Sequence, residues 1–199
     1  GSLTIMNSKD EGGIIGTGAN STGVVGSMLY AAYGSTLNLV NVNVTRTENT
    51  YPNKGGGVLG GNEGATINII DCVIDGALAG YSTAGGILHV ENATVNIHNS
   101  VLKNGTALSG GIIRIGNLAV VNMYSGEISG NTGKGYGGAV QLQGNGTFNL
   151  YGGKLTGNTA EQTGGAIHAS GNAKIHLENV QITGNQANQG GAVYMTTEK

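Results

Sequence analysis

Short runs in which apolar and polar residues alternate recur along the chain at a nearly constant interval. The clearest copies are GGAVQLQGNGTFNLYGGKLTGN at 137–158 and GGAIHASGNAKIHLENVQITGN at 164–185, which align without a gap. The position of the second glycine in these copies recurs along the chain at Ser27, Gly57, Gly86, Gly111, Gly138, Gly165 and Gly191. Self-similarity with a fixed period of this length indicates a solenoid of stacked repeats.

Each copy contains three alternating segments separated by Gly and Asn, such as AVQL at 139–142, TFNLY at 147–151 and KLT at 154–156. Alternation with period two predicts strands that bury one face, here with Val140 inward and Gln141 outward. We therefore predict an all-β, right-handed, single-stranded parallel β-helix. It should have about seven coils of about 25–30 residues, with three strands per coil.

Asparagines recur in register at two places in the predicted coil. One corner ladder consists of Asn131, Asn158 and Asn185, and a ladder along the outward centre of the second strand consists of Asn38, Asn68, Asn96, Asn122 and Asn149. A corner amide can bond the backbone of its own turn and stack on the next Asn. We interpret both ladders as structural.

The repeats predict one β-helix domain over 1–199, which we expect to be an excised piece of a longer chain. Residues 1–26 are expected to form an irregular first coil, although SLTIMN at 2–7 resembles a second strand. Residues 27–199 are expected to form regular coils. The segment RTENTYPNK, which contains the only Pro, is expected to project as a surface loop at 46–54.

Composition narrows the possible function classes. The net charge of −2 arises from 9 basic and 11 acidic residues without a Lys/Arg cluster, which argues against a nucleic-acid partner. The single Cys72 excludes an internal disulfide framework and a cysteine-rich zinc site. No apolar run approaches the length of a membrane span, so we expect no direct membrane insertion. We predict no cofactor and no metal.

The outward columns of the solenoid contain the candidate ligand-binding residues, because inward positions specify the core. These candidates are Tyr30, His89, Arg114, Gln141, His168 and Tyr194 on the first strand, with Tyr124 and Tyr151 after the second. The neighbouring first-strand column includes Glu91, Gln143 and Ser170. Such groups can bind a sugar or a protein by hydrogen bonding and stacking. An ordinary solvated face is the alternative interpretation.

The second strand also presents an outward column of threonines. Thr36, Thr66, Thr94 and Thr147 are in register, and Val120 and Lys174 interrupt the series. A flat face of Thr and Asn resembles the ice-binding surface of β-helical antifreeze proteins. The interruptions, together with bulky Tyr124 and Tyr151 nearby, make this alternative the weaker one.

The ionisable residues do not form a recognisable catalytic constellation. Polysaccharide cleavage requires paired carboxylates, or a base with a basic partner and often calcium. The only aspartates are Asp10, Asp71 and Asp75, and Lys103 stands in phase with Asp75 one coil later. His89 and His168 share a column but lie three coils apart, roughly 14 Å, which is too far for one metal ion. We predict no catalytic residue in this chain.

The repeated motifs resemble a known family. GGAV, GGAI and GGAV begin at Gly137, Gly164 and Gly190, and they alternate with ISGN, LTGN and ITGN. This pattern is similar to the GGA(I/L/V) and FxxN repeats of chlamydial polymorphic outer-membrane proteins, with Ile or Leu in place of Phe. It is similar more broadly to right-handed β-helix repeats of bacterial surface adhesins and autotransporter passengers. The resemblance implies export, a cell-surface or extracellular location and adhesion.

We therefore expect a non-catalytic segment of a secreted or cell-surface bacterial adhesin, acting as a stiff stalk or display surface. Its partner would be a host-surface protein or glycan. The alternative is a carbohydrate-binding or polysaccharide-degrading β-helix whose active site lies outside this chain, and ice binding is a weaker third hypothesis. The coil ends could also associate end to end, because unpaired β edges invite pairing.

Overall fold

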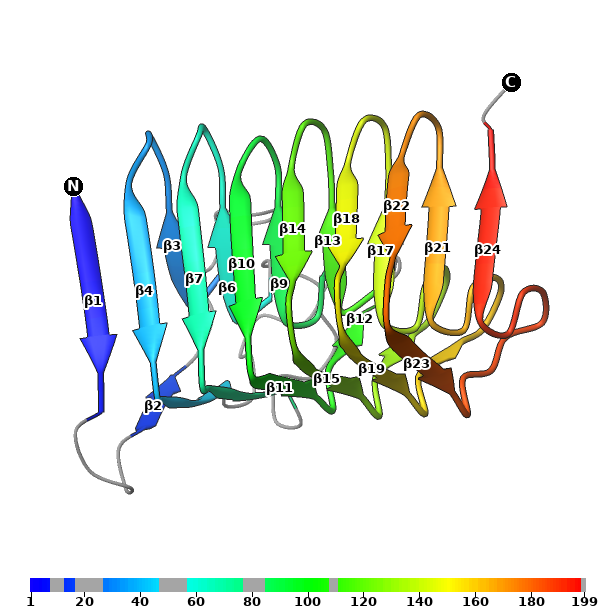
Figure 1. The fold of residues 1–199 in the computed structure, drawn as a ribbon, viewed down its shortest axis with the longest axis horizontal. Coiled ribbons are helices and arrows are strands. Elements are labelled where there is room, and N and C mark those ends of the chain that lie inside the picture. Colours follow the sequence, from blue (N-terminus) through cyan, green and yellow to red (C-terminus); the bar gives the residue numbers. More distant parts are fainter. Residues whose placement is uncertain (8–12, 17–26, 47–56, 77–84, 108–110, 198–199) are drawn as a thin grey trace.

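The chain winds into a parallel β-solenoid with its long axis running from the first strand to the last (Figure 1). The computed structural model describes residues 1–7, 13–16, 27–46, 57–76, 85–107 and 111–197. Every regular element in this part of the chain is a strand. The strands form three sheets of seven strands and one short sheet of three strands.

The front sheet consists of the predicted second strands. In spatial order it contains β1 (Ser2–Met6), β4 (Thr36–Val40), β7 (Thr66–Ile70), β10 (Thr94–His98), β14 (Val120–Met123), β18 (Thr147–Leu150) and β22 (Lys174–Leu177). All of its neighbouring strands pair in parallel. The segment that resembled an isolated second strand is therefore β1, which pairs with β4 and continues the sheet.

The base sheet consists of the predicted third strands. It contains β2 (Gly13–Gly16), β5 (Asn43–Arg46), β8 (Val73–Asp75), β11 (Ser100–Lys103), β15 (Gly126–Ser129), β19 (Gly153–Thr156) and β23 (Val180–Thr183). A fourth strand of two residues follows it in three coils and forms the short sheet. That sheet contains β12 (Thr106–Ala107), β16 (Thr132–Gly133) and β20 (Thr159–Ala160).

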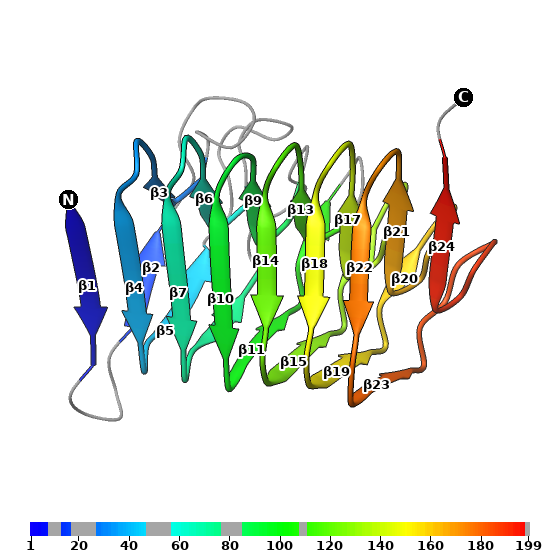
Figure 2. The ribbon, with the colours of Figure 1, turned by 45° about the horizontal axis from the view of Figure 1, so that its top comes forward.

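The rear sheet consists of the predicted first strands. It contains β3 (Leu29–Ala31), β6 (Leu59–Gly61), β9 (Leu88–Val90), β13 (Ile113–Ile115), β17 (Val140–Leu142), β21 (Ile167–Ser170) and β24 (Val193–Thr196). In Figures 1 and 2 the front strands point down and the rear strands point up. The chain passes down the front, back along the base and up the rear while it advances, so the coil is right-handed.

Inward side chains stack in register and fill the space between the sheets. Leu37, Ile67, Val95 and Val121 follow one another in the front sheet, and Phe148 continues the column. All five side chains are buried and belong to one hydrophobic core. Burial of each such side chain contributes about 1.5–3 kcal/mol relative to exposure. The core column explains why these positions vary only among apolar residues.

The corner between the front and base sheets requires a left-handed backbone conformation. Asn41, Asp71 and Asn99 occupy equivalent positions there with φ values of 52°, 54° and 43°. Asn and Asp tolerate this conformation better than other residues with a Cβ. At the start of the rear sheet the constraint is close approach. A Cβ on Gly165 would overlap the carbonyl oxygen of Gly191 in the next coil.

The structure confirms the predicted right-handed parallel β-helix, with about six turns where about seven were predicted. It adds the short fourth sheet, which the sequence prediction lacked. Arg46 was assigned to the start of a projecting loop, but it ends β5 and is fully buried. The remainder of that loop, 47–54, lies outside the described residues. In the predicted irregular coil over 1–26, the described parts include β1 and β2.

Candidate ligand-binding surface

The outward column of the rear sheet brings together the first-strand candidates. Strand pairing places Tyr30, Gly60, His89, Arg114, Gln141, His168 and Tyr194 side by side along the solenoid. Successive strands in a sheet lie about 4.8 Å apart, so these side chains form a column of fixed spacing. The period-two alternation therefore predicted correctly which residues share this column.

The column is less exposed than a solvated face would be. Only 1% of Gln141, 4% of His89 and 6% of His168 is accessible to solvent, whereas Tyr30 is 39% exposed. The interpretation of this column as an ordinary solvated face is wrong for these three buried polar residues. They point away from the hydrophobic core and are nevertheless buried.

Tyr136 and Thr163, each directly before a Gly-Gly pair, cover part of His168. The Tyr136 ring centroid lies 4.9 Å from that of His168, and Thr163 Oγ1 lies 2.6 Å from His168 Nδ1. On the other side, Tyr194 stacks on His168 with a centroid distance of 5.4 Å. Sequence reasoning missed Tyr136 and Thr163. Their signal was a variable polar or aromatic position directly before each GGA motif.

Around these residues the rear sheet forms a groove with a volume of about 280 Å³. Gln141 and Ser170 lie in its wall, together with Tyr136, His168 and Tyr194. Its lining combines aromatic rings with amide and hydroxyl groups, and no Lys, Arg, Asp or Glu of the described ranges belongs to it. Burial lowers the pKa of His168, which keeps its imidazole neutral at pH 7.

The charged part of the column lies one and two coils earlier. Arg114 donates a hydrogen bond from Nη2 to Oε1 of Gln143 at 2.8 Å, and Glu91 Oε1 lies 3.5 Å from His89 Nε2. Burial, assisted by the Arg114 charge and opposed by Glu91, lowers the pKa of His89 to about 4. His89 is therefore neutral at pH 7, and its contact with Glu91 is not an ion pair there.

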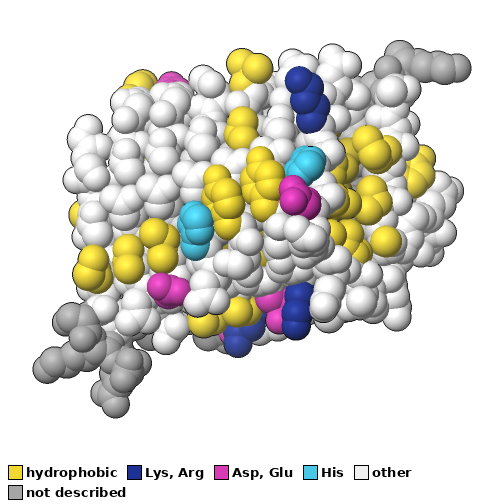
Figure 3. Space-filling view, viewed as in Figure 1, with side chains coloured by type: hydrophobic (Ala, Val, Ile, Leu, Met, Phe, Trp, Pro, Cys, Tyr) yellow, Lys and Arg dark blue, Asp and Glu magenta, His cyan; other side chains and the backbone are white. Residues whose placement is uncertain are grey.

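The remaining aromatic candidates form a stripe on the front sheet. The ring centroids of His98 and Tyr124 lie 4.4 Å apart, and those of Tyr124 and Tyr151 lie 5.4 Å apart, with near-parallel planes. His176 follows with a tilted ring 5.4 Å from Tyr151. Figure 3 shows hydrophobic side chains along this face with a His on either side. Because neighbouring rings cover one another's faces, the stripe presents ring edges to solvent.

The Asn ladder of the front sheet consists of side chains that bond from coil to coil. Each amide nitrogen donates to the Oδ1 of the preceding Asn, at 2.7 Å, 2.9 Å, 3.0 Å and 2.9 Å along the series Asn38, Asn68, Asn96, Asn122 and Asn149. These residues are half-buried. Their hydrogen-bonding capacity is directed along the sheet, which leaves little of it for a ligand.

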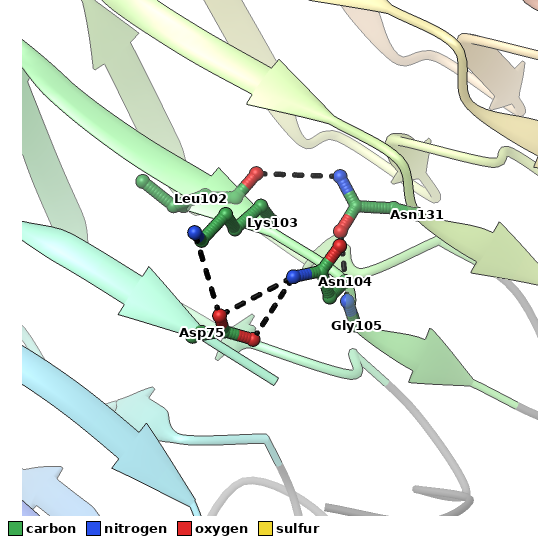
Figure 4. Close-up of polar contacts among 6 residues, drawn as sticks. All are labelled: Asp75, Leu102, Lys103, Asn104, Gly105 and Asn131. Atoms are coloured by element: carbon green, nitrogen blue, oxygen red, sulfur yellow. Dashed lines mark hydrogen bonds and ion pairs between the residues drawn. The ribbon is translucent and has the colours of Figure 1, made fainter. Parts of the chain in front are cut away.

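In the corner ladder of Asn131, Asn158 and Asn185, the first two residues are buried more deeply than the front-sheet asparagines. Asn131 donates to the carbonyl oxygen of Leu102 at 3.3 Å and accepts from the Gly105 N–H at 2.9 Å (Figure 4). It also donates to Asn158 Oδ1 at 2.8 Å. The predicted backbone partner was its own turn, but the observed partner is the preceding coil. The ladder therefore ties neighbouring coils together.

The aspartates of the described chain participate in similar contacts between coils. Asp71 accepts a hydrogen bond from Asn99 at 2.7 Å. Asp75 accepts from Asn104 and lies 3.6 Å from the Lys103 ammonium (Figure 4). Within the described ranges no three His, Cys, Asp or Glu side chains gather closely enough to hold a metal ion. No helix there is long and apolar enough to span a membrane.

A family comparison identifies the repeat type. The model of the Chlamydia polymorphic membrane protein repeat matches residues 179–196. This stretch includes β23 with its ITGN corner, the following GGAV and β24. The chain contains β-helix repeats of the polymorphic membrane protein type. Comparisons with curated proteins and with solved structures gave no significant match.

The polymorphic membrane protein repeat has a simple structural meaning in this solenoid. Its Asn marks the corner of Asn185, and its paired glycines include Gly191, whose carbonyl oxygen lies where a Cβ on Gly165 of the preceding coil would be. Equivalent residues in earlier coils occupy the same corners. Proteins with this repeat are associated with the bacterial outer membrane or surface. The letters shared by the copies in this chain thus describe the scaffold, whereas the column letters between them differ from copy to copy.

Proposed function

We propose that this chain is a non-catalytic segment of a bacterial cell-surface adhesin, in which the β-solenoid is a stiff rod that displays ligand-binding side chains. The observation that carries the proposal is the rear-sheet column, where polar and aromatic side chains lie in register beside a groove. The repeat type supports a surface location. A host-surface protein or glycan is the proposed partner.

The solenoid is suited to this role because its side chains are ordered before a ligand arrives. Gln141 is almost fully buried, and His168 is fixed by Thr163 and by two aromatic neighbours. Binding then requires little additional ordering of the protein, which reduces the entropic penalty of association. A scaffold built from strands also holds a site more rigidly than a loop does.

The absence of a catalytic role is part of the proposal. Asp71 and Asp75, which are candidates for a general acid or base, each accept hydrogen bonds from an Asn of the next coil. The described residues that line the groove in the rear sheet include no carboxylate. Glycosidic bond cleavage commonly relies on two carboxyl groups that face one another across the scissile bond.

Adhesion can be tested with beads that are coated with this chain and incubated with cultured epithelial cells. We expect the beads to adhere well above albumin-coated beads, and we expect excess soluble chain to compete. Circular dichroism with a β-rich spectrum verifies that the bead-bound preparation is folded. Absence of adhesion by folded chain across a panel of epithelial cell types contradicts the proposal. Release of reducing ends from polysaccharides contradicts its non-catalytic part.

A further inference from the structure

The groove over β17 and β21 has the features of a site for one particular ligand class. We propose that it binds an uncharged saccharide unit, with the Gln141 amide as the central hydrogen-bonding group and Tyr136 and Tyr194 as its flanks. This inference depends on the proposed adhesin function and specifies the chemistry of its ligand. It assigns the binding role to the groove rather than to the aromatic stripe of the front sheet.

The strongest argument is the state of the Gln141 side chain. Only 1% of the residue is exposed, and its Oε1 has no hydrogen-bond partner in the part of the chain that the structure describes. A buried polar atom without a partner costs about 1–3 kcal/mol. Neighbouring buried amides in the solenoid, such as Asn158, form several hydrogen bonds each. Gln141 belongs to the groove lining, so rotation of its amide toward the groove would let a ligand hydroxyl supply the partner that the side chain lacks.

The groove lining also matches a saccharide in its other groups. Ser170 adds a hydroxyl group to the wall that contains Gln141. Tyr136 and Tyr194 border the groove and lie on either side of His168. A small number of placed polar groups among aromatic side chains is typical of small-molecule sites. Sugars present both hydroxyl groups and apolar C–H faces, so they can use both kinds of contact.

The lack of charged groups in the described lining favours neutral over acidic saccharides as ligands. Among the described residues, the lining has no Lys or Arg that could neutralise a sulfate or carboxylate, and burial lowers the pKa of His168, which keeps it uncharged at pH 7. The nearest cation in the column, Arg114, is not part of that lining, and the Glu91 carboxylate interacts with its charge. An anion among the aromatic and amide groups of the groove would lose hydration without gaining a counter-charge, which is unfavourable. The groove should therefore prefer uncharged sugars.

The front-sheet stripe is less suited to the same ligand. Tyr124 and Tyr151 each have two ring neighbours, whereas Tyr136 and Tyr194 each have one among the described residues, the imidazole of His168. Both faces of Tyr124 and Tyr151 are therefore occupied, and one side of each groove tyrosine remains available. A sugar ring that packs on an aromatic residue requires an open face. The stripe presents edges, and its amide neighbours in the Asn ladder already bond to one another.

The test is saturation-transfer-difference NMR with the full 199-residue chain and a panel of neutral di- to tetrasaccharides, each paired with its sulfated or sialylated form. We expect at least one neutral member to bind and its acidic counterpart to bind at least about tenfold more weakly. Gln141→Leu removes the amide at similar volume, and Tyr136→Ser removes one half-exposed flank without changing a strand. Both variants should reduce affinity at least about tenfold, whereas Gln181→Leu on the exposed face of β23 should not.

The experiments distinguish failure of saccharide binding in the groove from failure of adhesion. Equal binding by wild type and by both groove variants overturns the inference, as does binding of acidic members alone. If coated beads adhere to cells but no panel member binds, or if beads with folded Tyr136→Ser adhere as well as wild type, adhesion stands and the groove assignment is wrong. If no beads adhere, the adhesin proposal itself fails, whatever the sugars do.

Discussion

At the scale of single residues, the solenoid is constrained most strictly where neighbouring coils approach each other. A Cβ on Gly138 would overlap the carbonyl oxygen of Gly165, and one on Gly165 would overlap that of Gly191. Gly157, in contrast, has φ of 61° and open space where a Cβ would lie. Two glycines of the same repeat are therefore present for different reasons. One permits contact between coils, and the other permits a left-handed turn.

This difference predicts opposite tolerance to substitution. Gly165→Ala should destabilise the chain by about 2–4 kcal/mol, because the new methyl group must displace backbone of the next coil. Gly157→Asn should change stability by less than about 0.5 kcal/mol, because Asn tolerates the left-handed conformation and meets no neighbour. Urea unfolding followed by circular dichroism measures both. Equal effects of the two substitutions would argue against close coil packing at Gly165.

The lowered pKa of His89 predicts that the stability of the fold depends on pH. Its pKa is lowered to about 4 in the folded chain, chiefly by burial, whereas the unfolded value is near 6.5. Between these values the unfolded chain binds the extra proton, so stability is fully present above about pH 6.5 and is lost as the pH falls towards 4. The loss should approach about 2–3 kcal/mol. His168, whose pKa is also lowered, adds a dependence of the same sign.

The test replaces His89 with Gln, and the control makes the same replacement at a second histidine, His176. His89→Gln should flatten the part of the pH dependence that lies between about pH 6.5 and 4. His176→Gln, on the exposed front sheet, should retain the wild-type dependence. Urea unfolding at pH 7.5, 5.5 and 4.5 gives the comparison. An unchanged slope in His89→Gln would show that other groups cause the dependence.

The rear column also shows what the sequence could predict of the site at this scale. Alternation with period two predicts that Gln141 and His168 point away from the core, and the strand register agrees. It does not predict that they are buried. His168 is covered in part by Tyr136 and Thr163, which lie between strands, where side-chain direction follows turn geometry rather than a period. The groove therefore emerges only when the coil is closed.

At the scale of elements, two ladders of the same residue type stabilise the solenoid in different ways. Asn122, in the front ladder, is half-buried and bonds only to Asn side chains. Asn158, in the corner ladder, is fully buried. It donates to the Ile128 carbonyl oxygen and to Asn185, and its Oδ1 accepts from the Asn131 backbone and side chain. The corner ladder thus supplies hydrogen-bond partners for backbone groups at the corner.

The two ladders should differ in their response to truncation. Asn158→Ala removes a buried side chain that satisfies two backbone groups of the preceding coil and should cost about 3 kcal/mol. Asn122→Ala removes two bonds at a half-exposed position and should cost about 1 kcal/mol or less. Thermal unfolding of both variants beside wild type measures the difference. A larger effect for Asn122→Ala would reverse the assignment of the corner ladder as the stronger link.

The elements themselves show why most of the fold was predictable. The front, base and rear strands have three to five residues, mostly with alternating side chains, and this alternation repeats in every copy. The short sheet escaped prediction because its strands have two residues, such as Thr132–Gly133, and two residues cannot display a period. Its signal was positional, namely the Thr that follows the corner Asn in the copies at 131 and 158.

At the scale of the whole molecule, each coil contacts mainly the coils on either side of it. Interior front strands such as β14 have two neighbours, whereas β1 and β22 have one each. Burial follows the same order, because Val121 and Phe148 are 0% exposed while Leu177 in β22 is 37% exposed and Leu3 in β1 is 57% exposed. In such quasi-one-dimensional arrays, stability is approximately a sum of repeat terms and nearest-neighbour interface terms.

This arrangement predicts graded opening rather than one uniform unfolding event. Amide hydrogen exchange of the 199-residue chain, followed by mass spectrometry, should be slowest in β10, β14 and β18 and faster in β1 and β22 by about an order of magnitude or more. Phe148→Ala should accelerate exchange most in β14, β18 and β22, because its side chain packs in the column that these strands share. Exchange in β4 should change less. Uniform protection of all seven front strands in wild type would instead indicate that the rod opens as a single cooperative unit.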